Sequence, residues 1–116
     1  MLATIKINKA KTPRLPYLTT MKKLFGGKYN LDLIFATPSI MKKIYKKNTN
    51  VLSFDLSKNQ GQIFLEPNLI KKEAGLYNRS FRQHVWALYI HGLLHLKGYG
   101  HGQRMEIMER KLCRGI

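Results

Sequence analysis

The chain has 116 residues, 44% of them hydrophobic, which predicts one globular domain over residues 1–116 and excludes a disordered chain. There are 21 Lys and Arg against 6 Asp and Glu, and the resulting net charge of +15 is spread along the chain. This exceeds the charge of about 2–8 that keeps a small domain soluble, so it favours a polyanionic partner, nucleic acid before a membrane surface.

The first half of the chain is predicted to contain two strands and two helices. Alternating apolar residues predict strands at residues 2–8 and 30–36, and helical spacing predicts helices at residues 17–25 and 38–47. The second helix is expected to begin with Thr37 as N-cap and Pro38 at its first position. Its inward face is expected to include Ile44.

The second half is predicted to contain two strands and three helices. Short strands at 51–54 and 62–65 are expected to pair antiparallel across a loop through Ser57, Asn59 and Gly61. Helices are expected at residues 67–74, from Ser80 to a stop at Gly98, and from residue 103. The order β-α-β-α-β-β-α-α-α predicts an α/β (α+β) fold, a mixed sheet of about four strands packed with helices.

The cellular setting is also predicted from what the chain lacks. Cys113 is the only cysteine, which excludes an intramolecular disulfide and a cysteine-based zinc site. No apolar run approaches the ~18 residues of a membrane span, and the N-terminal segment has no apolar region of signal-peptide length. We therefore expect a cytoplasmic protein with no membrane contact.

Three of the four histidines lie close together, in the segment His91-Gly-Leu-Leu-His95-Leu-Lys-Gly-Tyr-Gly-His101. Residues i and i+4 share one helix face, so His91 and His95 are expected to reach one ion from a central helix. A helix stop at Gly98 allows His101 to fold back as the third ligand. Three nitrogen ligands leave the fourth position of one divalent ion open, as in catalytic zinc sites, and Zn²⁺ is the expected metal.

Two other interpretations of the histidines are less favoured. Histidines of a buried helix can simply satisfy backbone groups, and a pair at i and i+4 alone would fit that account. The third histidine after a glycine-broken turn argues for a metal. A protease is disfavoured because Gly92 stands where the His-Glu-x-x-His motif has its general base, and because a basic chain gives no reason to expect a peptide substrate. His84 is expected to be an ordinary, partly exposed histidine.

The histidine segment resembles the signature H-G-x-L-H-L-x-G-Y-D-H of the YbeY family of rRNA maturation factors. Thr49-Asn-Val-Leu-Ser-Phe54 is similar to the T-D-V-L-S-F of that family, and Gly61-Gln-Ile63 to its G-D-I strand. Met105 and Glu109 fit its closing helix. The resemblance covers roughly residues 30–113, in the right order.

This resemblance implies a zincin-like fold and a metal-dependent, single-strand-specific endoribonuclease. It also implies a role in 3′-end maturation of small-subunit (16S) rRNA and in ribosome quality control. Zinc coordination by three histidines carries over to His91, His95 and His101. The expected partners are single-stranded rRNA and the small ribosomal subunit, and the sequence predicts no particular oligomeric state.

Four positions depart from the family pattern. Asn50, Gln62 and Gly100 stand where the family has Asp, and Tyr45-Lys46 stands for its Tyr-Arg, whose Arg is implicated in activity. The loss of three carboxylates should make the site more positive and remove groups that orient histidines. Lys binds phosphate as a point charge but cannot copy a bidentate Arg, so slow turnover is expected.

We therefore expect His91 and Lys46 to act in catalysis, while Lys42, Lys43, Lys46 and Lys47 draw the RNA backbone toward a cleft along strand 51–54. For Lys42 and Lys43 a solvated helix face is an equal alternative. No residue is an obvious general base. Two other functions stay open. One is a non-catalytic RNA-binding ribosome-assembly factor with a retained metal site, and the other is a metal hydrolase that acts on something other than RNA.

Overall fold

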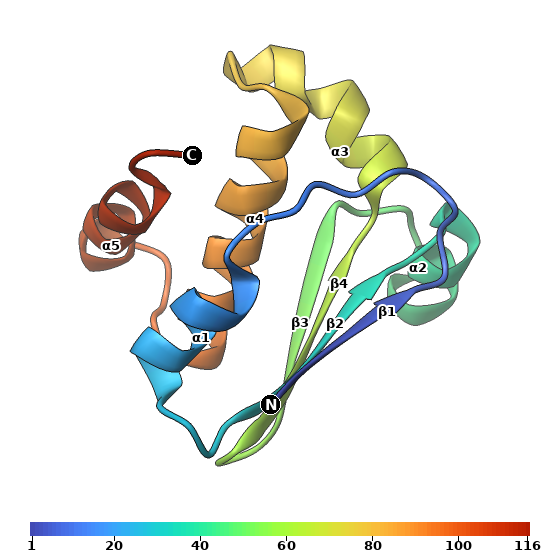
Figure 1. Cartoon of the computed structure of the whole chain (residues 1–116). Coiled ribbons are helices and arrows are strands. Elements are labelled where there is room, and N and C mark those ends of the chain that lie inside the picture. The colour runs from blue at the N-terminus through green and yellow to red at the C-terminus, as the bar shows by residue number, and fades with distance from the viewer.

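In the computed structural model, which describes residues 1–116, five helices surround one four-stranded sheet (Figure 1). The strands are β1 (Leu2–Lys6), β2 (Asn30–Phe35), β3 (Val51–Ser57) and β4 (Gln60–Leu65). The helices are α1 (Tyr17–Phe25), α2 (Pro38–Tyr45), α3 (Pro67–Ala74), α4 (Phe81–Leu96) and α5 (Gln103–Cys113), and a 3₁₀ turn, Gly75–Tyr77, joins α3 to α4. The strand order is β1-β2-β4-β3, with β3 antiparallel to β4 at one edge and the other pairs parallel. This confirms the predicted α+β fold with a mixed sheet.

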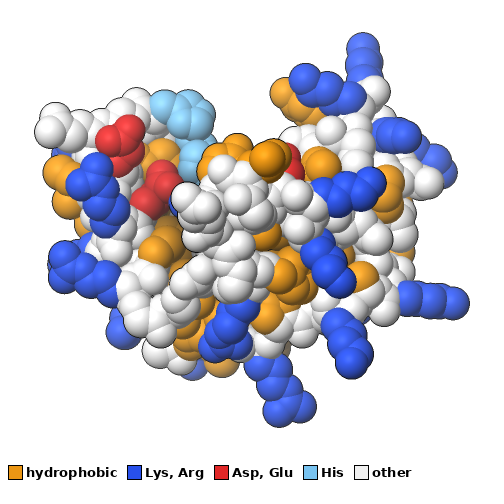
Figure 2. Space-filling model, turned by 90° about the horizontal axis from the view of Figure 1, so that it is seen from above, with side chains coloured by type: hydrophobic (Ala, Val, Ile, Leu, Met, Phe, Trp, Pro, Cys, Tyr) orange, Lys and Arg blue, Asp and Glu red, His pale blue; other side chains and the backbone are white.

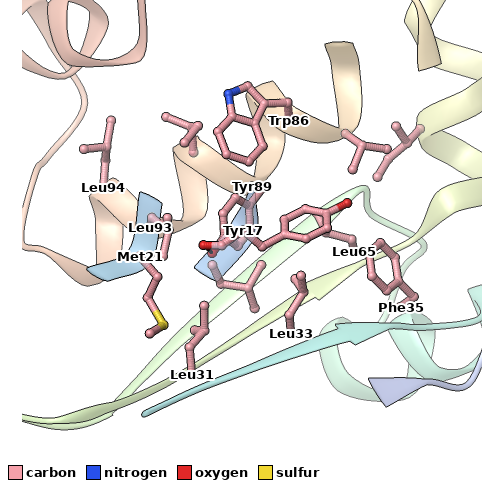
Figure 3. Close-up of a cluster of buried hydrophobic side chains, with 14 of the residues drawn as sticks. Tyr17, Met21, Leu31, Leu33, Phe35, Leu65, Trp86, Tyr89, Leu93 and Leu94 are labelled. Carbon is pink, nitrogen blue, oxygen red and sulfur yellow. Dashed lines mark hydrogen bonds between the residues drawn. The ribbon is translucent and has the colours of Figure 1, made fainter. Parts of the chain in front are cut away.

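The two faces of the sheet are covered by different helices. Alternate residues of a strand point to opposite faces. Leu31, Leu33 and Phe35 of β2 therefore face the main core, which includes buried side chains of α1 and α4 (Figure 3). Ile34 of β2 points the other way and packs with Met41 of α2 in a small second cluster. Helices α4 and α2 consequently lie on opposite faces of the sheet.

Helix α4 is the central helix, packed against β3, β4, α3 and α5. It starts at Ser80 in a capping box: the Ser80 hydroxyl accepts from the Gln83 backbone N–H at 3.1 Å, and the Gln83 side chain accepts from the Ser80 N–H at 2.9 Å. Gly92 lets α4 approach the sheet, because a Cβ there would lie only 3.1 Å from Cδ1 of Ile63. The Ser80 cap and the burial of this helix confirm the prediction. Neither α4 nor any other helix combines the length and apolarity needed to cross a bilayer.

Some predicted boundaries are wrong. Helix α2 ends at Tyr45, earlier than expected, because Lys46 adopts a left-handed conformation with φ +66°. Ile44 is 41% exposed rather than inward, since this short helix buries only Met41 against the sheet. The predicted loop through Ser57, Asn59 and Gly61 is shorter than expected, because Ser57 still belongs to β3 and Gly61 is a buried residue of β4.

Candidate metal centre

The C-terminal half of α4 and the loop after it bring three histidines together. His91 and His95 lie one helical turn apart, with their Nε2 atoms 3.0 Å from each other. His101 approaches from the loop before α5. One ring nitrogen from each of the three lies within 4.8 Å of the other two.

The turn that returns His101 begins at Gly98. Its φ of +102° ends α4, and the Tyr99 N–H donates back to the Leu94 carbonyl at 2.9 Å. Gly98 therefore stops the helix as the sequence predicts. Gly100 differs, because it has no positive φ and a Cβ added to it would meet no atom within 4 Å. The backbone at position 100 does not require glycine.

Two of the histidines are anchored through Nδ1. His95 Nδ1 lies 3.1 Å from the Tyr99 carbonyl oxygen, and His91 Nδ1 lies 3.4 Å from Oε1 of Glu109 on α5. A carbonyl or a carboxylate only accepts, so each ring donates from Nδ1 and carries its lone pair on Nε2. Such second partners fix the tautomer and orientation of histidines that bind metals.

The nitrogen donors fit a divalent ion such as zinc. With Nδ1 protonated in both rings, the Nε2 atoms of His91 and His95 face each other as two acceptors, which cannot hydrogen bond to one another. Ligand nitrogens at bond lengths of about 2.0–2.1 Å in a tetrahedral zinc site lie about 3.3 Å apart, close to this spacing. Burial, followed by the neighbouring His91, lowers the pKa of His95 and favours the neutral ring that a metal needs.

One side of the histidine group is open to ligands. His91 and His95 are partly buried, whereas His101 is exposed. Residues 97–104, including His101, line a hollow of about 580 Å³. Figure 2 shows histidine side chains at the surface beside acidic ones, with a hollow separating them from a group of Lys and Arg side chains. A metal held by three histidines would thus retain access to a substrate.

A second hollow, of about 260 Å³, includes His91 and Glu109 in its wall, together with Asn50, Tyr77, Arg79 and His84. The prediction that His84 is partly exposed is wrong, because His84 is only 1% exposed. It precedes His91 by seven residues, nearly two helical turns, so both lie on the same side of α4. On that side His84 Nε2 lies 3.5 Å from Oε1 of Glu73, a residue of α3.

Two of the departures from the family pattern are now explained. The Asn50 amide donates to Oε1 of Glu73 at 2.9 Å, a contact in which an ionised Asp would be repelled. Gln62 alternates with Gly61 and Ile63, which face α4, so Gln62 belongs to the face of the sheet that α2 covers. Of the three positions, Gly100 directly precedes His101 in the chain and Asn50 shares the wall of the second hollow with His91, whereas Gln62 lies on the other face of the sheet.

The predicted RNA-binding lysines lie apart from the histidines. Lys42 and Lys43 are in α2, on the opposite face of the sheet, and Lys46 and Lys47 follow it. All four are exposed. Lys47 Nζ lies 5.8 Å from the ring centroid of Tyr45, and no contact joins any of the four to a histidine. They are placed to attract a polyanion rather than to touch the metal ligands.

Sequence reasoning missed the roles of Glu109, Glu73 and Arg79. Glu109 is 18 residues from its partner His91, and the loop between α4 and α5 separates them, so no single helix face carries both. Two signals existed: the chain has only 6 acidic residues, and Glu109 fits the closing helix of the family that the chain resembles. In so basic a protein, each carboxylate beside a histidine merits attention.

Comparison with known proteins gives one consistent result. A family model described as "Endoribonuclease YbeY" matches residues 7–113. The protein named Endoribonuclease YbeY from Phytoplasma mali (strain AT) is 37% identical over 116 residues, which cover 89% of this chain and 78% of that protein. The one from Buchnera aphidicola subsp. Acyrthosiphon pisum (strain APS) is 35% identical, covering 90% and 79%. A solution structure of a Thermotoga maritima protein aligns with a TM-score of 0.67 at 21% identity, covering 97% of this chain and 87% of that one, which supports the fold.

Proposed function

The chain belongs to the endoribonuclease YbeY family, and from this premise we propose that it is a metal-dependent endoribonuclease that cleaves single-stranded RNA. The observation that carries the proposal is the group of three histidines, two of which have Nδ1 anchored and Nε2 turned toward each other. The charge of +15 supports an RNA substrate.

His91, His95 and His101 hold the metal, most suitably Zn²⁺ given three nitrogen ligands. When bound, the ion supplies Lewis acidity toward water and phosphoryl oxygens. Glu109 accepts the Nδ1 proton of His91, and the Tyr99 carbonyl accepts that of His95, so that both rings keep their orientation. Neither contact involves the substrate, so both rings are already oriented when RNA binds.

The lysines bind the RNA backbone. Lys42, Lys43, Lys46 and Lys47 form an exposed basic group at and after the end of α2. Their role is to attract and hold phosphates. Lys46, which touches no metal ligand, contributes to catalysis by binding a phosphate oxygen of the RNA as a point charge. Replacing all four with Gln should flatten the dependence of RNA affinity on salt. An affinity that does not respond to salt would contradict this electrostatic account.

The natural substrate we propose is the 3′ end of small-subunit (16S) rRNA, which the protein would meet on the small ribosomal subunit in the cytoplasm. The support is the family and its signature motif. A second function is favoured by the substitutions at Lys46 and Gly100: a non-catalytic RNA-binding ribosome-assembly factor that retains the metal. Loss of a bidentate Arg and of an Asp next to His101 would slow turnover more than it would weaken binding.

One experiment separates these two functions. Purified protein, with and without zinc, is incubated with single-stranded RNA, duplex RNA and small subunits that carry unprocessed 3′ ends. We expect slow, metal-dependent cleavage of the single strand, which His91→Ala abolishes while its circular dichroism spectrum stays that of the wild type. Metal content should fall from about one ion per chain in wild type to a small fraction in His95→Ala. Binding without any cleavage would support the assembly factor instead.

A further inference from the structure

The hollow beside His91 contains two exposed groups that the proposed centre does not use. Tyr77 is 56% exposed, and Arg79 is also exposed. The Arg79 guanidinium carbon lies 5.5 Å from the centroid of the Tyr77 ring. The guanidinium thus lies over the ring. An aromatic ring and a guanidinium are the groups with which proteins bind a base and a phosphate of single-stranded nucleic acid.

Arg79 is held in place by a series of partly buried polar contacts. Its Nη1 lies 3.2 Å from His84 Nδ1, which must accept because a guanidinium only donates. The proton of His84 is therefore on Nε2, which lies 3.5 Å from Oε1 of Glu73 without forming a hydrogen bond. The same Glu73 oxygen accepts from the Asn50 amide. This arrangement engages one edge of the guanidinium, and its remaining N–H groups are free to bind a phosphate in two-point fashion.

Tyr77 is also held in place. Its ring stacks on His84, with centroids 5.0 Å apart and an angle of 25° between the planes. His84 is 1% exposed, so it forms a fixed support on one side, while more than half of Tyr77 remains open to solvent. A supported, open aromatic ring suits base stacking because little side-chain freedom is lost when the base binds.

We propose that this hollow binds one nucleotide of the single-stranded RNA, with its phosphate on Arg79 and its base on Tyr77, directly beside the metal ligand His91. The inference rests on the proposed function and deepens it, since it names residues that bind the RNA next to the reacting group. It also assigns a use to His84, which positions both side chains and contacts no metal ligand.

Binding of a fluorescent single-stranded 2′-O-methyl RNA hexanucleotide, followed by anisotropy across a range of salt concentrations, tests the phosphate contact. Arg79→Gln should weaken binding about fivefold and reduce the slope of log affinity against log salt by about 0.7, the value for one phosphate on a single strand. Arg114→Gln is the matched control. Arg114 is exposed beyond the end of α5, outside the hollow beside His91, and its loss should leave the slope unchanged.

The base contact has its own variants. Tyr77→Ser should weaken binding about tenfold with an unchanged salt slope, whereas Tyr77→Phe, which keeps the ring, should bind like wild type. An RNA containing 4-thiouridine, irradiated in near-ultraviolet light, should cross-link to the tryptic peptide 73–79. Zinc content and circular dichroism are measured for every variant to confirm an intact fold.

The outcomes distinguish this inference from the function on which it rests. If wild-type protein binds RNA but Arg79→Gln and Tyr77→Ser bind equally well, with cross-links only elsewhere, the nucleotide site is wrong and the endoribonuclease proposal stands. If wild-type protein binds no RNA even at low salt, the proposed function fails and the nucleotide site fails with it.

Discussion

Removing the carboxylate of Glu109 should weaken metal binding without changing the metal ligands. Glu109 Oε1 lies 3.4 Å from His91 Nδ1, and the two side chains are 30% and 28% exposed. Loss of such an outer partner typically lowers metal affinity about 10–100-fold. Because this contact is long and partly solvated, we expect the lower end for Glu109→Leu, about tenfold, or about 1.4 kcal/mol. Glu109→Gln keeps an acceptor oxygen without the charge and should fall between Glu109→Leu and wild type.

The assay is competition for zinc against a chromophoric chelator at pH 7. Glu106→Gln is the matched control, because Glu106 is exposed one turn earlier on α5, has no contact with a histidine, and its loss changes the net charge equally. Zinc affinity in Glu109→Leu equal to that of wild type and of Glu106→Gln would refute the assignment of Glu109 as the group that orients His91.

Three further predictions concern stability, pH and backbone strain. A Cβ on Gly61 would collide with the Tyr29 hydroxyl and lie 2.9 Å from Leu96, so Gly61→Ala should lower the free energy of unfolding by about 2 kcal/mol in urea titrations. Adding Tyr29→Phe should restore part of that loss, since this hydroxyl is buried without a hydrogen-bond partner; no restoration would mean that the collision lies elsewhere. Burial lowers the pKa of His84 below 6.5, so the unfolded chain takes up a proton that the folded chain refuses, and stability should fall as pH drops below 6.5. His84→Gln should remove the contribution of His84 to this loss of stability, which is at most about 1.4 kcal/mol per pH unit. If the variant shows the same pH profile as wild type, His84 does not contribute to the loss. Lys46→Gly should relieve the left-handed backbone and raise the free energy of unfolding by about 1 kcal/mol while weakening RNA binding. Lys46→Arg should increase the cleavage rate. RNA binding that is unchanged in Lys46→Gly, together with slower cleavage by Lys46→Arg, would argue against a phosphate contact at this position.

The departures from the family pattern do not all bear on the metal. Gln62 lies on the sheet face opposite α4, and Asn50, which lines the hollow beside His91, suits the carboxylate of Glu73. Gly100 is the position where an acidic residue can be restored, because its Cβ space is open and its backbone has no positive φ. Of the three substituted positions, Gln62 is thus the one that lies away from the histidines.

The sequence by itself determined the features that depend on neighbours along the chain. The spacing of His91 and His95 places both on one helix face, a Gly stop returns His101, and Ser80 caps the helix, all of which follow from the 3.6-residue period and from local backbone preferences. Alternation and helical spacing likewise gave the order of strands and helices and the antiparallel pair at the sheet edge.

Only the tertiary structure decided which elements meet. Glu109 reaches His91 because α5 packs on α4, and Glu73 reaches His84 because α3 does. The lysines of α2 lie on the far face of the sheet because Met41 packs there with Ile34. Periodicity identifies the buried face of a helix but not the element that covers it, since many pairings bury similar apolar area. The partners that orient the histidines, and the hollow beside them, arise from that choice of packing.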